Sequence, residues 1–236
     1  MALPLGDPSN VTDLLKEHSD LVFGGSPAIR GQFPWQVILR KRTETGYWLC
    51  GGTLITRRHV LTAGHCLEEG KVLAGSVAVF GVVDKTTISI TPGVQTINFA
   101  SYVVHPDFVV APGYHNDIGV VTLASDVVFS EFVQPIEIRA NDDDLITTSD
   151  AYNKAILTEK QVCAGADGRG IGRGDSGGPL QVKTNGKWVQ IGLTSILRER
   201  SQGVHPNQAL YPPVFTRVSK YCNFIAASTQ NMFQCV

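Results

Sequence analysis

Short apolar runs separated by turn residues fill most of the chain, and this pattern constrains its fold more than any other feature. The runs are rich in β-branched residues and include residues 36–39, 49–55, 77–80, 120–123, 180–182, 188–193 and 213–217. Runs of this length, punctuated by Gly, Pro and Asn, are typical of strands in antiparallel barrels and sandwiches. A helical period occurs only near the end, at Val218, Tyr221, Cys222 and Ile225. The pattern therefore predicts an all-β fold with a C-terminal helix over about residues 218–230.

The composition limits the kinds of partner that the chain binds. Its 236 residues are 43% hydrophobic and 17% charged, which is typical of a compact protein with a substantial core. The net charge of −1 gives no basis for binding nucleic acid or an anionic membrane surface. No apolar run approaches the roughly 18 residues that cross a bilayer. We therefore expect neither nucleic acid nor a membrane as a partner.

Residues 174–179, GDSGGP, place a serine between glycines on a tight turn. Such a turn presents the hydroxyl of Ser176 while backbone N–H groups point at the same place, as acyl transfer requires. Two upstream segments, LTAGHC and NDIGV, supply His65 and Asp117. The order His, Asp, Ser differs from the order in lipases and subtilisins. On these three motifs the chain resembles the trypsin/chymotrypsin-like serine protease family.

The resemblance implies a role for each residue of these motifs. Ser176 would be the nucleophile, and His65 would act first as general base and then as general acid. Asp117 would hold the imidazole in the productive tautomer, and the N–H groups of Gly174 and Ser176 would form the oxyanion hole. The chain would then be a serine endopeptidase that works through an acyl-enzyme, without a cofactor or a metal.

The resemblance also implies activation by cleavage. Residues 1–21 would be a leader or pro-segment, and residues 22–236 the peptidase domain. Cleavage would free the amine of Val22, which would enter the protein and pair with Asp175. The residue before the cut is Leu21, where the family usually has Arg or Lys, so the activator would be an enzyme that accepts leucine.

Two antiparallel barrels of the six-stranded type are expected, the first over about residues 34–125 and the second over about 126–217. The second barrel is expected to be incomplete. Only 26 residues lie between Ile136 and Cys163, and the Gly-Trp-Gly hairpin of the family is missing there. A barrel that lacks strands leaves unpaired edges. Within this shortened region we expect residues 141–144 and 152–153 to form loops rather than core.

Five cysteines are present, an odd number. The resemblance pairs Cys50 with Cys66, and so short a closed loop contributes about 3 kcal/mol while fixing the histidine segment. Cys163, Cys222 and Cys235 remain, so at least one of them lacks an intrachain partner. If Cys222 and Cys235 are joined, the C-terminal helix must stop early, because thirteen helical steps span about 20 Å.

The cysteines and the resemblance point to secretion, although the first residues do not resemble a signal peptide. Cysteines in this number suggest an oxidising compartment. Residues 1–8 have neither a basic segment nor an apolar segment of the kind that signal peptides contain. Secretion is therefore expected from the family alone.

The resemblance places four residues at the primary substrate pocket: Gly170, Ser195, Leu197 and Pro213. Trypsin-like members have an aspartate six residues before the nucleophile, and Gly170 takes that position here. A preference for Arg or Lys is therefore disfavoured. Leu197 and Pro213 would narrow the pocket, as in elastase-like members that accept small apolar side chains.

Two other motifs overlap the serine segment. G-x-S-x-G is also the nucleophile elbow of α/β-hydrolases, but only Glu199 and His205 follow Ser176 as acid and histidine, without alternating strands and helices. Arg173-Gly174-Asp175-Ser176 matches an adhesion motif, which we interpret as coincidence because the protease fold buries Asp175.

The chain is thus interpreted as a monomeric secreted zymogen that acts on protein or peptide substrates and binds protease inhibitors. The alternative is a catalytically inactive homologue that acts as a binding or regulatory protein, disabled by its incomplete second barrel.

Overall fold

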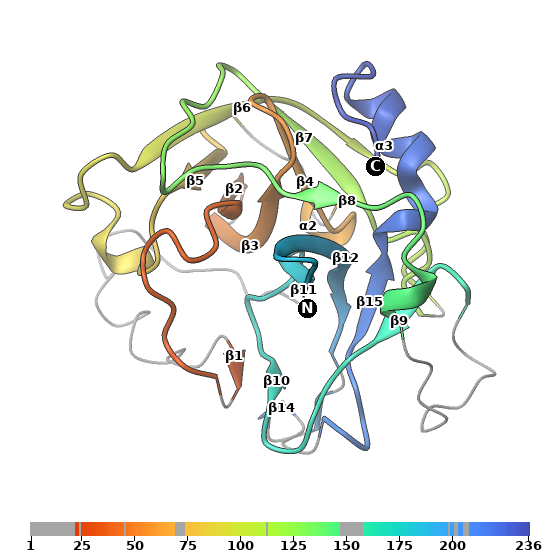
Figure 1. Cartoon of the computed structure of the whole chain (residues 1–236). Helices are drawn as coiled ribbons and strands as arrows, with labels where there is room; N and C mark the ends of the chain where they lie inside the picture. The colour runs from red at the N-terminus through yellow and green to blue at the C-terminus, as the bar shows by residue number, and fades with distance from the viewer. Residues whose placement is uncertain are drawn as a thin grey trace.

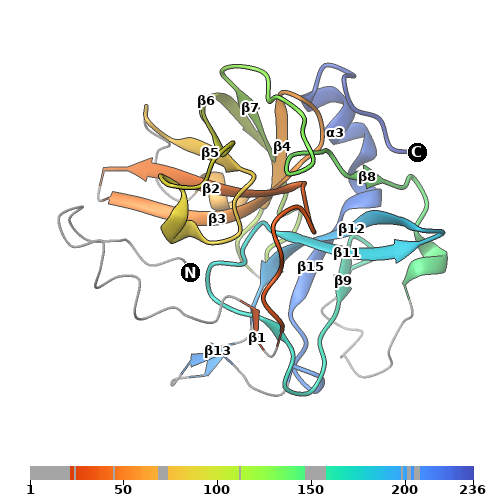
Figure 2. The same cartoon turned by 60° about the vertical axis from the view of Figure 1, so that its left-hand side comes forward.

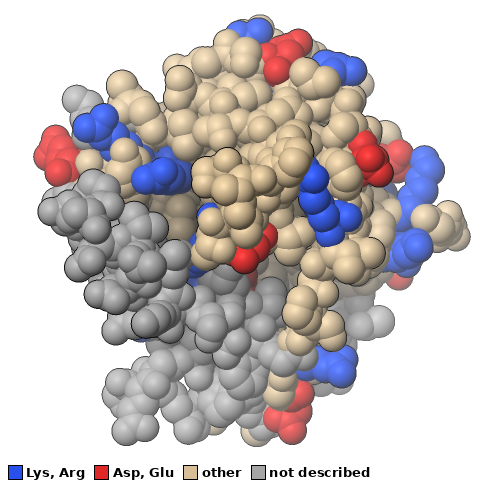
Figure 3. Space-filling view, turned by 90° about the vertical axis from the view of Figure 1, so that its left-hand side faces the viewer, with Lys and Arg blue, Asp and Glu red and all other residues tan. Residues whose placement is uncertain are grey.

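The computed structural model describes residues 22–23, 25–44, 46–68, 74–111, 113–146, 158–197, 199–200, 203–204 and 208–236. It confirms the all-β class with a short helix near the C-terminus (Figure 1). No helix in these residues is long and apolar enough to cross a membrane. On the face in Figure 3, basic and acidic side chains are scattered among uncharged ones, in keeping with the small net charge.

The first half forms a closed barrel in which six strands follow the order β2-β3-β4-β7-β6-β5. Its strands are β2 (Gln36–Thr43), β3 (Gly46–Leu54), β4 (His59–Thr62), β5 (Val77–Phe80), β6 (Gln95–Val104) and β7 (Gly119–Leu123). Alternate residues of β2, such as Val37 and Leu39, point into the barrel and are almost fully buried. One hydrophobic cluster inside the barrel takes side chains from five strands, and residues of β6 pack against it.

Among the described residues, the second half forms a five-stranded sheet that does not close, which confirms the prediction of an incomplete second barrel. Its main path is β11-β12-β15-β9, and β8 pairs with β12 in parallel. The strands are β8 (Glu137–Ile138), β9 (Gln161–Cys163), β11 (Pro179–Thr184), β12 (Lys187–Ile196) and β15 (Val214–Arg217).

Short elements complete the described chain. They are β1 (Val22–Phe23), α2 (His65–Glu68), η2 (Lys85–Thr87), η3 (Asp143–Leu145), β10 (Gly170–Ile171), β13 (Glu199–Arg200), β14 (Gly203–Val204), η4 (Val218–Tyr221) and α3 (Cys222–Ser228). β1 lies antiparallel to β10, with Val22 opposite Ile171, and β13 pairs with β14 (Figures 1 and 2).

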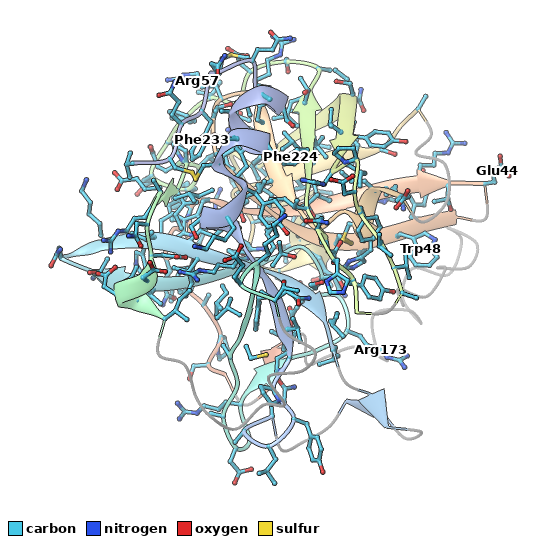
Figure 4. All side chains as sticks on the ribbon, turned by 90° about the vertical axis from the view of Figure 1, so that its right-hand side faces the viewer. Glu44, Trp48, Arg57, Arg173, Phe224 and Phe233 are labelled. Atoms are coloured by element: carbon cyan, nitrogen blue, oxygen red, sulfur yellow. A yellow bond between two sulfur atoms is a disulfide. The ribbon has the colours of Figure 1, made fainter. Side chains whose placement is uncertain are left out.

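The two halves share a hydrophobic core. Ile55, Leu61, Ile118 and Val120 of the first barrel pack in one cluster with residues of the second half, which are Ile138, Leu193, Val218, Tyr221 and Ile225. Phe224 and Phe233 pack against the same cluster from the C-terminal segment (Figure 4). This core fixes the halves against each other, so groups from both can meet at one site.

The C-terminal segment covers part of the edge at β8. The N–H of Val236 donates to the carbonyl of Ile138 at 3.0 Å, and the N–H of Ala140 donates to the carbonyl of Val236 at 2.7 Å. A disulfide joins Cys222 to Cys235, with their Cα atoms 5.8 Å apart. The helix α3 therefore stops at Ser228, earlier than the predicted residue 230, and the chain turns back.

One acidic residue of the shortened region is buried, contrary to the prediction of a loop outside the core. Asp142 is 1% exposed, although no strand includes it. Its Oδ1 accepts hydrogen bonds from Arg217 Nε at 2.9 Å and from Ser219 Oγ at 2.8 Å. The guanidinium of Arg217 compensates the buried charge, which is why a polar segment packs here. Residues 152–153 lie outside the described residues.

We expect the double variant Cys222→Ser/Cys235→Ser to lose about 3 kcal/mol of unfolding free energy, because the closed loop restricts the unfolded chain. Urea unfolding followed by tryptophan fluorescence measures the loss. Gln234→Ser, at an exposed neighbour of Cys235, is the control and should leave the midpoint unchanged. Equal midpoints for the double variant and the parent would show that the bridge does not stabilise this segment.

Candidate active site

His65 and Asp117 meet because their segments flank paired strands. His65 begins α2 just after β4, and Asp117 precedes β7, with Thr62 of β4 opposite Gly119 of β7. His65 Nδ1 lies 2.8 Å from Asp117 Oδ2, and the backbone N–H of His65 donates to Asp117 Oδ1 at 2.8 Å. Asp117 is fully buried. The carboxylate thus holds both the main chain and the ring of His65.

The second half supplies two more hydrogen bonds to Asp117. Ser195 Oγ of β12 donates to Asp117 Oδ2 at 2.6 Å, and Thr216 Oγ1 of β15 donates to the Asp117 carbonyl at 2.8 Å. A carboxylate oxygen beside Nδ1 favours the tautomer of His65 with its proton on that nitrogen. The resemblance assigns Ser195 to the substrate pocket, but its hydroxyl lies against Asp117.

Tyr114 and Asn116 flank the acid; Tyr114 lies outside the sequence motifs, and Asn116 belongs to NDIGV but has no assigned role there. The ring of Tyr114 meets that of His65 edge-on, with centroids 5.6 Å apart. Asn116 has a φ of 52°, and its Oδ1 accepts hydrogen bonds from Lys160 Nζ at 3.2 Å and from the Tyr221 hydroxyl at 3.1 Å. These contacts fix the turn that presents Asp117.

The serine segment lies against the start of the histidine segment. Gly177 has a φ of 76°, and a Cβ there would stand 2.2 Å from Thr62 Oγ1. The carbonyl of Ser176 accepts a hydrogen bond from the N–H of Gly51 at 2.7 Å. Glycine at 177 is therefore required both by the backbone conformation and by the close approach of the first barrel.

The described structure contains no hydrogen bond between Ser176 Oγ and His65. Among the described residues, the N–H groups of Gly174 and Ser176 likewise donate to no acceptor, and Gly174 has a φ of 97°. Catalytic hydrogen bonds are often long before a substrate binds. The two N–H groups therefore remain available to a ligand.

Asp175 stands next to Ser176 without a cation among the described residues. Its Oδ2 accepts a hydrogen bond from the N–H of Gly172 at 2.7 Å. Burial raises the pKa of Asp175 to about 7, and the hydrogen bond from Gly172 opposes this rise. Val22 follows residue 21 in the intact chain, so its nitrogen belongs to a peptide bond and carries no charge. The pairing of Val22 with Asp175 is therefore not formed in this state.

The remaining residues assigned to the pocket lie in the second half. Leu197 follows β12 and Pro213 precedes β15, next to the paired residues Ile196 and Val214. Gly170 belongs to β10, and the side chain of Gln208 fills the space beside it. No sequence pattern indicated Gln208.

One group of potential metal ligands is found among the described residues, and it does not fit a metal. The ligand atoms of Cys50, His65 and Cys66 lie within 4.8 Å of one another. However, Cys50 and Cys66 form a disulfide with an S–S distance of 2.03 Å, so neither offers a thiolate. Cys163 lies outside both disulfides.

The two overlapping motifs have no support in this arrangement. The described chain has no alternation of strands and helices, which an α/β-hydrolase elbow requires. In the adhesion motif, Arg173 is exposed, whereas the Asp175 carboxylate is turned to the backbone of Gly172.

Comparison with known proteins establishes the family. The model of the family Trypsin matches residues 22–152 and 145–225. Human chymotrypsin-like elastase family member 1 is 33% identical over 258 residues, covering 91% of this chain and 94% of that protein. Venom serine protease Bi-VSP of Bombus ignitus is 30% identical, covering 89% of this chain and 69% of that protein. The chain therefore belongs to the trypsin family of serine proteases, and it is classed as a serine-type endopeptidase.

These comparisons also bear on length and location. The alignment with the human protein runs over 258 residues, more than the 236 of the whole chain, so the relative has positions without a counterpart here. Two disulfides in a chain of this family indicate an extracellular protein.

We expect the intact chain to lose stability as the pH rises from about 4 to 7. Asp175 has a folded pKa of about 7 and an unfolded value near 3.8, so the folded state binds more protons in this window. The stabilisation is complete below the unfolded pKa and is lost as the pH passes the folded pKa, by up to about 4 kcal/mol.

Urea unfolding of the intact chain at a series of pH values tests this expectation. Asp175→Asn should remove most of the slope, because the amide does not titrate. Asp126→Asn, at an exposed carboxylate, is the matched control and should keep it. A slope that survives in Asp175→Asn would assign the pH dependence to other groups.

Proposed function

We propose that this chain is the precursor of a serine endopeptidase in which Ser176, His65 and Asp117 form the catalytic triad. The observation that carries the proposal is the buried His65–Asp117 pair, joined at 2.8 Å and braced from the second half by Ser195. A bond from Nδ1 to a carboxylate leaves Nε2 as the proton acceptor for a nucleophile. The GDSGGP turn supplies that nucleophile beside two N–H groups that lack an acceptor among the described residues.

The reaction proceeds in two stages, acylation of Ser176 and hydrolysis of the acyl-enzyme. Ser176 Oγ attacks the scissile carbonyl while His65 Nε2 takes its proton, and the imidazolium that forms is stabilised by Asp117. The oxyanion accepts hydrogen bonds from the N–H groups of Gly174 and Ser176, each contributing on the order of 10²–10³ in rate. His65 returns the proton to the leaving amine. Water then attacks the acyl group while His65 takes a proton from the water. His65 passes that proton to Ser176 Oγ as the ester bond breaks, which restores the free serine and releases the acid product.

Activation requires a cation near Asp175. In the intact chain, burial raises the pKa of this carboxylate to about 7. Cleavage before Val22 creates a charged amine on β1, the strand that pairs with β10. Transfer of that amine to Asp175 compensates the buried charge and draws the segment around Gly174 into its active form. An activator that accepts Leu21 performs the cut.

The proposed substrates are proteins or peptides with a small apolar residue before the cleaved bond. Gly170 provides no negative charge to pair with Arg or Lys in a substrate. Leu197 and Pro213 neighbour the paired residues Ile196 and Val214, and their side chains narrow the pocket. The similarity to a protein named as an elastase supports this preference. Secretion, a monomeric state and inhibition by protease inhibitors complete the proposal. The assembled His65–Asp117 pair gives no support to the inactive homologue.

Labelling with a fluorophosphonate tests the proposal. Residues 17–21 are replaced by a site for a specific protease, so that cleavage leaves Val22 as the first residue. The cleaved protein should be labelled, and Ser176→Ala should abolish labelling, because the probe reacts only with an activated serine. Ser101→Ala, at an exposed serine of β6, is the control and should label like the parent.

The intact chain should label far more slowly than the cleaved chain, because Asp175 lacks its cation there. A folded, correctly cleaved protein that does not label would contradict the protease function and leave the inactive homologue.

A further inference from the structure

Gln208 is a fully buried polar residue that the proposed mechanism does not use. It is 0% exposed. Its Nε2 donates to the carbonyl of Ile171 at 2.7 Å, and its Oε1 accepts from the N–H of Ile171 at 3.0 Å. The amide thus binds both polar groups of one residue of β10, as a neighbouring strand would.

Two glycines make room for Gln208. A Cβ at Gly170 would stand 1.6 Å from Gln208 Oε1, and a Cβ at Gly165 would stand 2.5 Å from the Gln208 carbonyl oxygen. Both distances are far below any van der Waals contact. The amide of Gln208 therefore occupies the space into which any side chain at position 170 would project.

This space lies at the proposed substrate pocket. Gly170 is assigned to that pocket, and Pro213, also assigned to it, follows Gln208 by five residues. The segment between Gly165 and Gly170 turns back on itself through the bridge of Ala166 and Arg169, so Gly165 faces the main chain of Gln208 and Gly170 faces its side-chain amide.

We propose that Gln208 forms the base of the primary substrate pocket and restricts it to small uncharged side chains. This inference rests on the proposed protease function and names the residue that sets its substrate class. The amide fills volume, which excludes long side chains. It carries no charge, and its bonds to Ile171 hold it in place, so it offers no counter-ion to Lys or Arg.

Two substitutions of Gln208 separate the effect of side-chain volume on substrate preference from the effect of charge. Gln208→Ala removes the amide and should deepen the pocket, and Gln208→Glu places a carboxylate of the same shape beside Gly170. Each is made in the cleaved protein, with the fluorophosphonate label used to count active sites. Peptide substrates that differ only in Ala, Leu or Lys before the cleaved bond are then compared by kcat/KM.

In Gln208→Ala, the ratio of kcat/KM for Leu over Ala should rise by about tenfold or more, as expected when a pocket gains room for further methylenes. In Gln208→Glu, the ratio for Lys over Ala should rise by a similar factor, because the carboxylate provides a partner for the ammonium. Gln234→Glu adds the same charge at an exposed site and should leave all ratios unchanged.

The outcomes are distinct. Variants that label like the parent but keep its kcat/KM ratios within twofold would overturn the inference. Gln208 would then only stabilise β10, and the protease function would be unaffected. Absence of labelling in the parent overturns both. If Gln208→Ala does not fold, the Lys ratio of Gln208→Glu decides the inference by itself.

Discussion

The buried carboxylate of Asp117 is the interaction on which the rest of the site depends. Its side chain and carbonyl bind His65 of the first barrel and Ser195 and Thr216 of the second half. A fully buried charge is tolerated only where donors surround it. The site therefore exists only when both halves are docked, and the shared core around Ile118 and Leu193 is what docks them.

The hydrogen bonds from the second half to Asp117 come from strands that this shortened half retains. Ser195 and Thr216 come from β12 and β15, which pair directly with each other. The edge left at β8 is partly covered by Val236, and the disulfide of Cys222 and Cys235 holds that segment in place. The incomplete sheet thus affects the periphery more than the acid.

The sequence predicts those features that are local. The residues proposed for the triad lie in short motifs, the strands show as short apolar runs, and the missing hairpin shows as a short spacing, so each is visible in a short stretch of sequence. Gln208 and Asp142 are different, because their burial depends on partners far along the chain. Gln208 binds Ile171 at a separation of 37 residues, and Asp142 binds Arg217 at a separation of 75. A polar residue with a remote partner has no local pattern that distinguishes it from one in a surface loop.

The paired strands β1 and β10 lie near the serine segment, and the hydrogen bonds of Ile171 in β10 bear on activation. The N–H and carbonyl of Ile171 are bound by Gln208, whereas Val22 of β1 lies opposite Ile171 on the other side. If β1 leaves β10 after cleavage, the polar groups of Ile171 keep their partners, and no buried donor or acceptor is orphaned there. The hydrogen bonds between Gln208 and Ile171 do not depend on β1. In the proposed activation, the freed amine of Val22 would pair with Asp175, a carboxylate whose pKa burial has raised. The strand β10 thus contacts both Gln208, at the proposed substrate pocket, and β1, which carries the proposed activating residue Val22.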